Sequence, residues 1–156
     1  IDPDARALAD IAHHAAEFVR SLGIRPRVAM VSFSNFGSVD HTESRRVAEA
    51  VRLMHSEDPD LEIDGEMQAD TAVDANRLRT FTFSHLKSPA NVLVFSSLSA
   101  ANAAYKLLSQ LGGADAIGPV LLGMNRPVHI LQRGCSVQEI LNLATLATVD
   151  WQARSK

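Results

Sequence analysis

Blocks of hydrophobic and polar positions alternate along the chain, and each block predicts one element of secondary structure. Apolar residues that recur every three or four positions are typical of amphipathic helices. This spacing occurs in the segments Asp4–Leu22, Val47–Met54, Ala100–Leu111 and Ser136–Thr148. Short continuous apolar runs predict strands buried on both faces. These runs are Arg27–Phe33 and Val92–Phe95.

Weaker patterns predict further elements between these blocks. We expect additional strands at Leu61–Glu66, Ala116–Leu122 and Val128–Leu131, and a short helix at Ala72–Leu78. Aromatic and aliphatic side chains are expected to fill the edge of the core, namely Phe81, Phe83 and Leu86. The inner face of the last helix is expected to carry Val137, Ile140, Leu141, Ala144, Ala147 and Thr148.

Alternating strands and helices predict an α/β fold, a mostly parallel sheet flanked by helices, with residues 1–156 forming one domain. In such folds the loops that follow the strands meet at the carboxyl edge of the sheet, where ligands bind. Four loops are expected there: Ser34–Ser38, Gln68–Asp70, Ser96–Asn102 and Gln132–Ser136.

Composition narrows the possible partners. Apolar residues are 46% of the chain and charged residues 21%, as in ordinary globular domains. The net charge of −3 gives no case for nucleic-acid binding or for an anionic membrane. Cys135 is the single cysteine, so the chain has no internal disulfide and a reducing cytoplasm is expected.

The sequence predicts no metal site. Asp64, Glu66 and Asp70 are three carboxylates that could hold a metal through oxygen ligands, but they lack the spacing of an EF-hand and a solvated acidic turn is the favoured structure. His13 and His14 are adjacent on a helix, so their side chains point in different directions and do not share a metal.

Two positions are candidates for binding an anion. The serines that follow Phe95 precede a helix whose free N–H groups suit an anion, although a serine that simply caps the helix is the favoured explanation. Arg133 lies in a glycine-containing loop ahead of the last helix, where a charge and free N–H groups combine; a solvated loop arginine is the alternative. Ser136 and Glu139 form a capping box, which gives Glu139 a structural role.

Six segments occur together in an order that resembles the phosphate acetyltransferase (phosphotransacetylase) family. They are SFSNFGS, DGEMQAD, ANVLVFSSLSAANAAYKLL, GPVLLGM, RPVHIL and QRGCSVQEI. Within this family, SFSNFGS, DGEMQAD, PVHIL and NLATLATVD look most like the carboxyl-terminal domain of large bacterial NADP-dependent malic enzymes. The resemblance implies that the chain is a fragment of a longer malic enzyme.

The family implies an acetyl-CoA site and dimers built through this region, with no covalently bound cofactor. NADP and a divalent Mg or Mn ion would belong to the malic enzyme domain that is absent here. The residues expected to bind acetyl-CoA or phosphate are Ser34, Asn35, Gly37, Ser38, Asn102, Lys106, Gln132 and Arg133. If the domain is catalytically active, Arg133 and Glu139 are the residues expected to act.

The chain departs from the family pattern at three positions. Gln132 stands where family members usually have Ser, Glu139 where they have Asp, and Phe36 where many have a cation. Glutamine cannot ionise, and extending Asp to Glu moves the carboxylate by roughly 1.5 Å, enough to cost on the order of 100-fold in rate. These changes favour a domain that still binds the ligand but no longer catalyses acetyl transfer.

Three hypotheses about function follow. The first is an acetyl-CoA-binding regulatory and oligomerisation module for an attached amino-terminal malic enzyme domain, which converts malate to pyruvate and CO₂. The second is an active phosphate acetyltransferase that converts acetyl-CoA and phosphate to acetyl phosphate and CoA. The third is a platform that only assembles malic enzyme protomers into a homo-oligomer.

Overall fold

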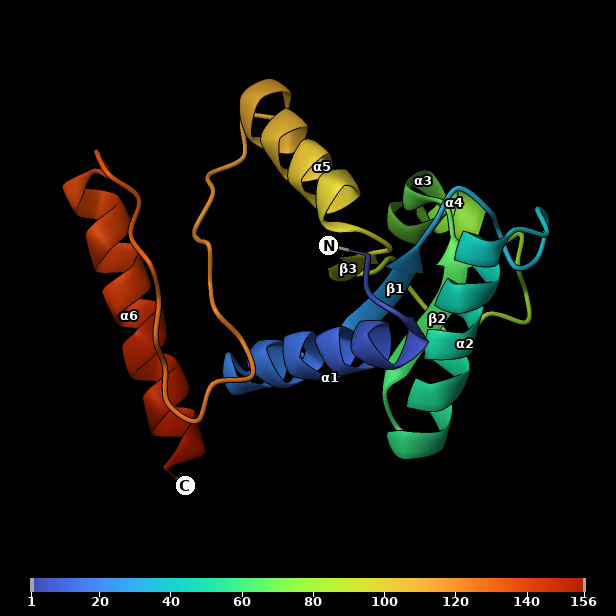
Figure 1. The fold of residues 1–156 in the computed structure, drawn as a ribbon, viewed down its shortest axis with the longest axis horizontal. Helices are drawn as coiled ribbons and strands as arrows, with labels where there is room; N and C mark the ends of the chain where they lie inside the picture. Colours follow the sequence, from blue (N-terminus) through green and yellow to red (C-terminus); the bar gives the residue numbers. More distant parts are fainter. Residues whose placement is uncertain (1, 156) are drawn as a thin grey trace.

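The fold is built on a three-stranded parallel sheet, seen in a computed structural model that describes residues 2–155 (Figure 1). The strands are β1 (Arg27–Val31), β2 (Glu62–Met67) and β3 (Val92–Phe95), in the order β2-β1-β3. Both neighbours of β1 run parallel to it. The α/β class with a parallel sheet is therefore confirmed.

Two long helices cover one face of this sheet. Both α1 (Ala5–Ser21) and α2 (Thr42–Glu57) lie against the sheet, with α2 running alongside β2 in Figure 1. Their buried stripes meet alternate strand side chains, because successive residues of a strand point to opposite faces. The resulting cluster contains Leu8, Ala12, Val47, Met54, Val28, Met30, Ile63, Val92 and Val94.

A smaller apolar cluster lies on the opposite face. It joins Ala29 and Met67 of the sheet to Ala72 and Leu78, which belong to the short helices α3 (Ala69–Val73) and α4 (Ala75–Leu78). Leu86 completes the cluster, as expected, but Phe83 is 64% exposed and does not fill the core. Where one short helix was expected at Ala72–Leu78, the chain forms two.

Side-chain caps fix where the helices begin. The Asp4 carboxylate accepts a hydrogen bond from Ala7 N at 2.8 Å, and α1 starts at the next residue. The capping box predicted at Ser136 and Glu139 is present at the start of α6 (Val137–Arg154). A second capping box, between His41 and Ser44, starts α2. Each cap satisfies N–H groups that the first helical turn leaves without partners.

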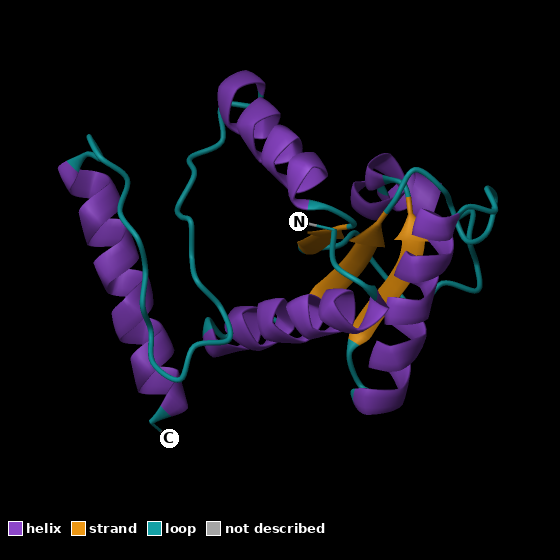
Figure 2. Cartoon of the chain, in the orientation of Figure 1, coloured by secondary structure: helices purple, strands orange, loops and turns teal. Residues whose placement is uncertain are grey.

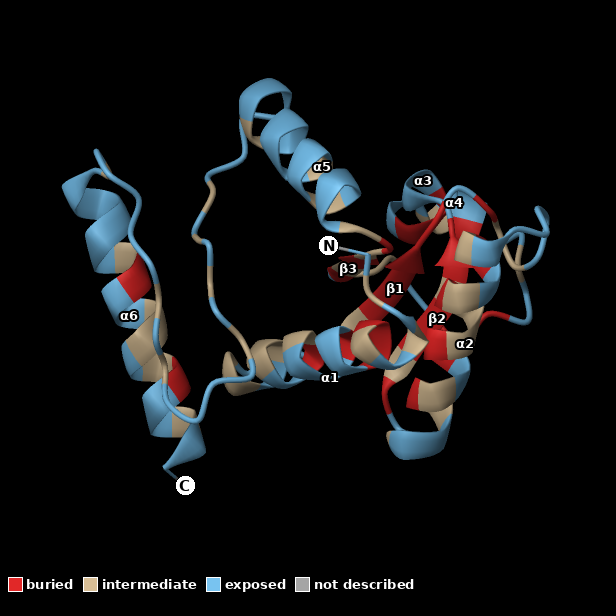
Figure 3. Ribbon diagram, in the orientation of Figure 1, coloured by how far each residue is buried: buried red, intermediate tan, exposed pale blue. Residues whose placement is uncertain are grey.

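The last third of the described chain extends away from the sheet (Figure 3). Helix α5 (Leu98–Leu111) has no buried residue, and its leucines at 107, 108 and 111 are 58%, 59% and 82% exposed. In α6 the buried residues are Leu143 and Asp150. The predicted inner face of the last helix is therefore wrong for the described chain, where Val137 is 72% exposed. The apolar stripe is largely exposed, and within residues 2–155 the helix meets α1 and the segment at Arg126 and Pro127, which lies beside Ala147 and Thr148.

The segment between α5 and α6 is extended without forming the two predicted strands (Figure 2). Only an isolated antiparallel bridge joins Val120 and His129. Pro119 has no N–H to donate, and Gly118 has a φ of 148°, so this run cannot continue a ladder. Because no strand precedes it, the loop Gln132–Ser136 does not lie at the edge of the sheet, contrary to the prediction.

No helix within residues 2–155 has the length and apolarity that a bilayer crossing requires.

Candidate functional site

The loop that follows β1 is organised around one buried carboxylate, that of Glu66. Glu66 Oε1 accepts hydrogen bonds from Ser34 Oγ at 2.8 Å and from Gly37 N at 2.6 Å. Ser34 Oγ in turn accepts a hydrogen bond from Val39 N at 3.0 Å. Ser34 is fully buried and Glu66 is 3% exposed. The predicted site residues Ser34, Gly37 and Ser38 are thus held in one network, since Ser38 Oγ lies 3.2 Å from Ser34 Oγ.

A register shift in the sheet brings Glu66 to this loop. Met30 pairs with Gly65 and Val31 pairs with Met67, so Glu66 is passed over in the ladder. A bulge of this kind re-aims a side chain that would otherwise alternate with its neighbours. Gly65 makes the bulge possible: its φ is 145°, and a Cβ there would lie 2.6 Å from the Met30 carbonyl oxygen.

A second carboxylate lies at the end of β3. Glu43, in the first turn of α2, accepts a hydrogen bond from Ser96 Oγ at 2.9 Å. Arg46 Nη2 donates to the Ser96 carbonyl oxygen at 3.3 Å, while Arg46 Nε is buried without a partner. Ser97 caps α5 through Ala100 N, so the capping interpretation of this serine cluster is confirmed.

The predicted turn of solvated acids is wrong for two of its three members. Asp64 is 6% exposed and Glu66 is 3% exposed, and both belong to β2. Sequence reasoning missed the buried Glu66 and the half-buried Glu43 and Arg46. Gly65 could have predicted the inward turn of Glu66, because a glycine inside a strand indicates a bulge or a close backbone approach.

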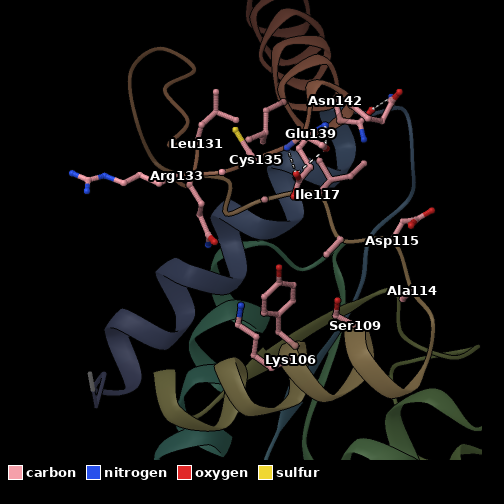
Figure 4. Close-up of a pocket in the computed structure, with 18 residues that line it drawn as sticks. Lys106, Ser109, Ala114, Asp115, Ile117, Leu131, Arg133, Cys135, Glu139 and Asn142 are labelled. Carbon is pink, nitrogen blue, oxygen red and sulfur yellow. Dashed lines mark hydrogen bonds between the residues drawn. The ribbon is translucent and has the colours of Figure 1, made fainter.

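A separate pocket of about 690 Å³ lies between α5 and the segment that leads into α6 (Figure 4). Four predicted residues line it: Lys106, Gln132, Arg133 and Glu139. Asn102 and the loop Ser34–Ser38 are not among its lining residues within the described chain. The structure therefore divides the predicted site residues between two places, the sheet edge and this pocket.

The two cations of the pocket are not equivalent. Lys106 Nζ lies 4.9 Å from the centroid of the Tyr105 ring, a cation–π distance, on the helix wall of the pocket. The Arg133 side chain extends outward from its loop, away from Lys106 and Glu139 (Figure 4).

Glu139 is held as a capping carboxylate. Its Oε2 accepts hydrogen bonds from Ser136 N at 2.6 Å and from Ser136 Oγ at 2.8 Å. The backbone bond and then the hydroxyl bond lower the pKa of Glu139 from its ordinary value of 4.5. A carboxylate stabilised in its charged form is a weaker base, so this arrangement works against proton abstraction by Glu139.

Comparisons with known proteins agree on the family. A model described as phosphate acetyl/butaryl transferase matches residues 1–148. The chain is 43% identical over 147 residues to a phosphate acetyltransferase of Bacillus subtilis, covering 94% of this chain and 46% of that enzyme. It is 44% identical over 155 residues to an NADP-dependent malic enzyme of Escherichia coli, covering 98% of this chain and 20% of that enzyme.

A solved structure shows the same fold. A phosphotransacetylase from Streptococcus pyogenes superposes on the whole chain with a TM-score of 0.90 at 39% sequence identity, and the chain covers 47% of that protein. The chain thus spans about half the length of phosphotransacetylases it matches, and about a fifth of a malic enzyme.

Proposed function

The chain belongs to the phosphate acetyl/butaryl transferase family, and on that premise we propose that it is the acetyl-CoA-binding regulatory module of an NADP-dependent malic enzyme. In this proposal an amino-terminal malic enzyme domain precedes it, binds NADP and a Mg or Mn ion, and works in the cytoplasm. The module also joins protomers into a homo-oligomer.

The hydrogen bonds of Glu139 to Ser136 are the observation that favours regulation over catalysis. Identity does not separate the alternatives, because the chain is about equally similar to a phosphate acetyltransferase and to a malic enzyme. The Glu139 carboxylate is tied to Ser136, with its pKa lowered. Binding a thioester needs no proton transfer, whereas forming one from CoA requires the thiol to lose a proton.

The pocket supports an acyl-CoA ligand through its charge. Lys106 and Arg133 are cations on two sides of a polar pocket, and CoA carries several phosphate oxygens that such cations recognise. Gln132 adds an amide that can donate and accept hydrogen bonds. In this proposal Asn35, Gly37, Ser38 and Asn102 contact the ligand from the sheet edge, while the fully buried Ser34 holds their loop in place.

Regulation requires that the ligand bind two conformations of the assembly with different affinity. Malate decarboxylation yields pyruvate, which feeds acetyl-CoA, so inhibition by acetyl-CoA is the expected direction. The pocket lies outside the two apolar clusters of the sheet, so its walls can move without disrupting the core.

The test is malate oxidation by the full-length protein, titrated with acetyl-CoA. We expect inhibition in the wild type and loss of that response in Arg133→Ala, with the uninhibited rate unchanged. Arg126→Ala is the matched control, because this arginine stacks on Trp151 and does not line the pocket. A wild-type enzyme that ignores acetyl-CoA would refute the regulatory proposal.

An active phosphate acetyltransferase is the second candidate, favoured by the similarity to the Bacillus subtilis enzyme. The assay is formation of acetyl-CoA from acetyl phosphate and CoA by the full-length protein. Turnover at ordinary enzyme rates that is lost in Arg133→Ala would replace the regulatory proposal with catalysis. If both assays are negative and truncation dissolves the oligomer, assembly alone remains.

A further inference from the structure

Three side chains converge on the outer side of β2, away from the pocket described above. They are His55 from the last turn of α2, Asp64 from β2 and His85 from the loop between α4 and β3. One ring nitrogen of each histidine and one carboxylate oxygen of Asp64 all lie within 4.8 Å of one another. The two imidazole rings are 4.3 Å apart between centroids.

Asp64 is buried and oriented, so it is not an ordinary surface acid. Its Oδ2 accepts hydrogen bonds from Ser84 Oγ at 2.8 Å and from His85 N at 2.6 Å, and its Oδ1 accepts one from Gly65 N at 2.9 Å. Within residues 2–155 its one ion-pair partner is His85, whose Nδ1 lies 3.7 Å from Oδ2. His85 is charged only if protonated, and no Lys or Arg of the described chain pairs with Asp64, so a bound cation would supply the positive charge that a buried carboxylate favours.

His55 has the hydrogen bond that metal-binding histidines commonly make. Its Nε2 lies 2.9 Å from the Ile63 carbonyl oxygen. A carbonyl oxygen only accepts, so Nε2 carries the proton and the other ring nitrogen of the neutral ring keeps its lone pair. Bonds of this kind to a backbone carbonyl fix the ring and its tautomer beside a metal.

We propose that His55, Asp64 and His85 bind one late first-row divalent cation, Zn²⁺ in the cell. Two imidazoles and one carboxylate match the ligands that zinc takes, whereas magnesium and calcium prefer oxygen alone. Ligand nitrogens about 2.0–2.1 Å from a tetrahedral zinc are roughly 3.3 Å from each other. His85 is 64% exposed at its side chain, so its ring is free to make the movement that closes the triangle.

The cation would fasten the loop before β3 to α2 and β2. These three segments are separated in sequence, and the loop otherwise contributes Leu86 and Ser84 to the interior. A metal that binds only the folded arrangement stabilises it in proportion to its concentration relative to Kd. The fourth coordination position, on the exposed side at His85, is left for water.

The experiment uses full-length protein stripped with a chelator and titrated with Zn²⁺ by calorimetry, with Co²⁺ absorption as a second readout. The wild type should bind one more equivalent per chain than His85→Gln, or bind it at least 10-fold more tightly. His55→Gln should show the same loss. His13→Gln is the matched control, since His13 is an exposed histidine on α1 outside the cluster.

Equal stoichiometry and affinity in the wild type and in His85→Gln would overturn the proposal. Equal losses in His13→Gln would do so as well, because binding would then be nonspecific. All three glutamine variants keep a side chain of similar polarity, and far-ultraviolet circular dichroism verifies that each is folded. The readout is metal binding rather than enzyme activity, so it stands or falls separately from the proposed function.

Discussion

Glu66 Oε1 accepts a hydrogen bond from Ser34 Oγ at 2.8 Å, and this contact joins the end of β2 to the loop after β1. The same oxygen accepts a hydrogen bond from Gly37 N, so one buried atom holds the turn at both Ser34 and Gly37. The loop that carries four predicted ligand contacts is therefore positioned by a residue outside it.

Glu66→Gln should destabilise the fold by about 1–3 kcal/mol, because an amide oxygen accepts weaker hydrogen bonds than a carboxylate and the new NH₂ group is buried beside Ser34 and Gly37. Urea unfolding of the full-length protein measures the change. Glu49→Gln is the matched control: this carboxylate pairs with Arg52 on the surface of α2, and its loss should leave stability nearly unchanged. Equal effects of the two substitutions would contradict the role of Glu66.

Gly65→Ala should destabilise the protein by more than about 2 kcal/mol, because the new Cβ would meet the Met30 carbonyl oxygen at 2.6 Å. Gly23→Ala is the control that distinguishes a steric clash of the new Cβ from backbone strain. Gly23 also has a positive φ, but its added Cβ meets nothing within 4 Å. We expect Gly23→Ala to cost about 1 kcal/mol. Comparable midpoints for the two variants in thermal unfolding would rule out the close approach.

The carboxyl of Glu139 should titrate below its ordinary pKa of 4.5, as followed by carbon NMR. Because its folded pKa is lowered, its contribution to stability is present above pH 4.5 and is lost as pH falls through the folded pKa. Ser136→Ala should move the midpoint upward by removing the hydroxyl donor. Ser97→Ala removes the equivalent cap of α5 and should leave the Glu139 midpoint unchanged.

Lys106→Ala should weaken acetyl-CoA binding by roughly tenfold, the scale of one lost charge-assisted hydrogen bond. Isothermal titration of the full-length protein measures it, at two salt concentrations because a phosphate contact is screened. Lys87→Ala removes the same charge from the loop before β3, where Lys87 Nζ donates to the Ser84 carbonyl oxygen. Equal affinity in both variants would remove Lys106 from the proposed site.

Local patterns in the sequence predicted the elements of the core well. The buried strands at Arg27 and Val92, the glycine that ends α5 and the capping box at Ser136 all depend on neighbouring residues, and the structure confirms them. The expected strand at Leu61–Glu66 is also present, shifted by one residue to Glu62–Met67. Family membership followed from the same kind of local motif, and the comparisons confirm it.

Contacts between segments that are distant in the chain could not be predicted from the sequence. Ser34 and Glu66 are 32 residues apart and meet only because a bulge turns one side chain, which alternation alone does not foresee. The sequence did not predict a site at His55 and His85, because these residues are also far apart in the chain and come together only in the fold. The strand expected at Ala116–Leu122 did not form because Gly118 and Pro119 interrupt it, which leaves an isolated bridge between Val120 and His129.

The larger apolar cluster draws all of its members from Leu8 to Val94, although the described chain continues to residue 155. Its central strand, β1, pairs with β3 some 60 residues downstream. Closing so long a loop slows folding. On the ribosome, a nascent chain has every residue this cluster needs once Phe95 has emerged. The sheet can thus fold while α5 and α6 are still being synthesised, before any partner for their apolar faces is required.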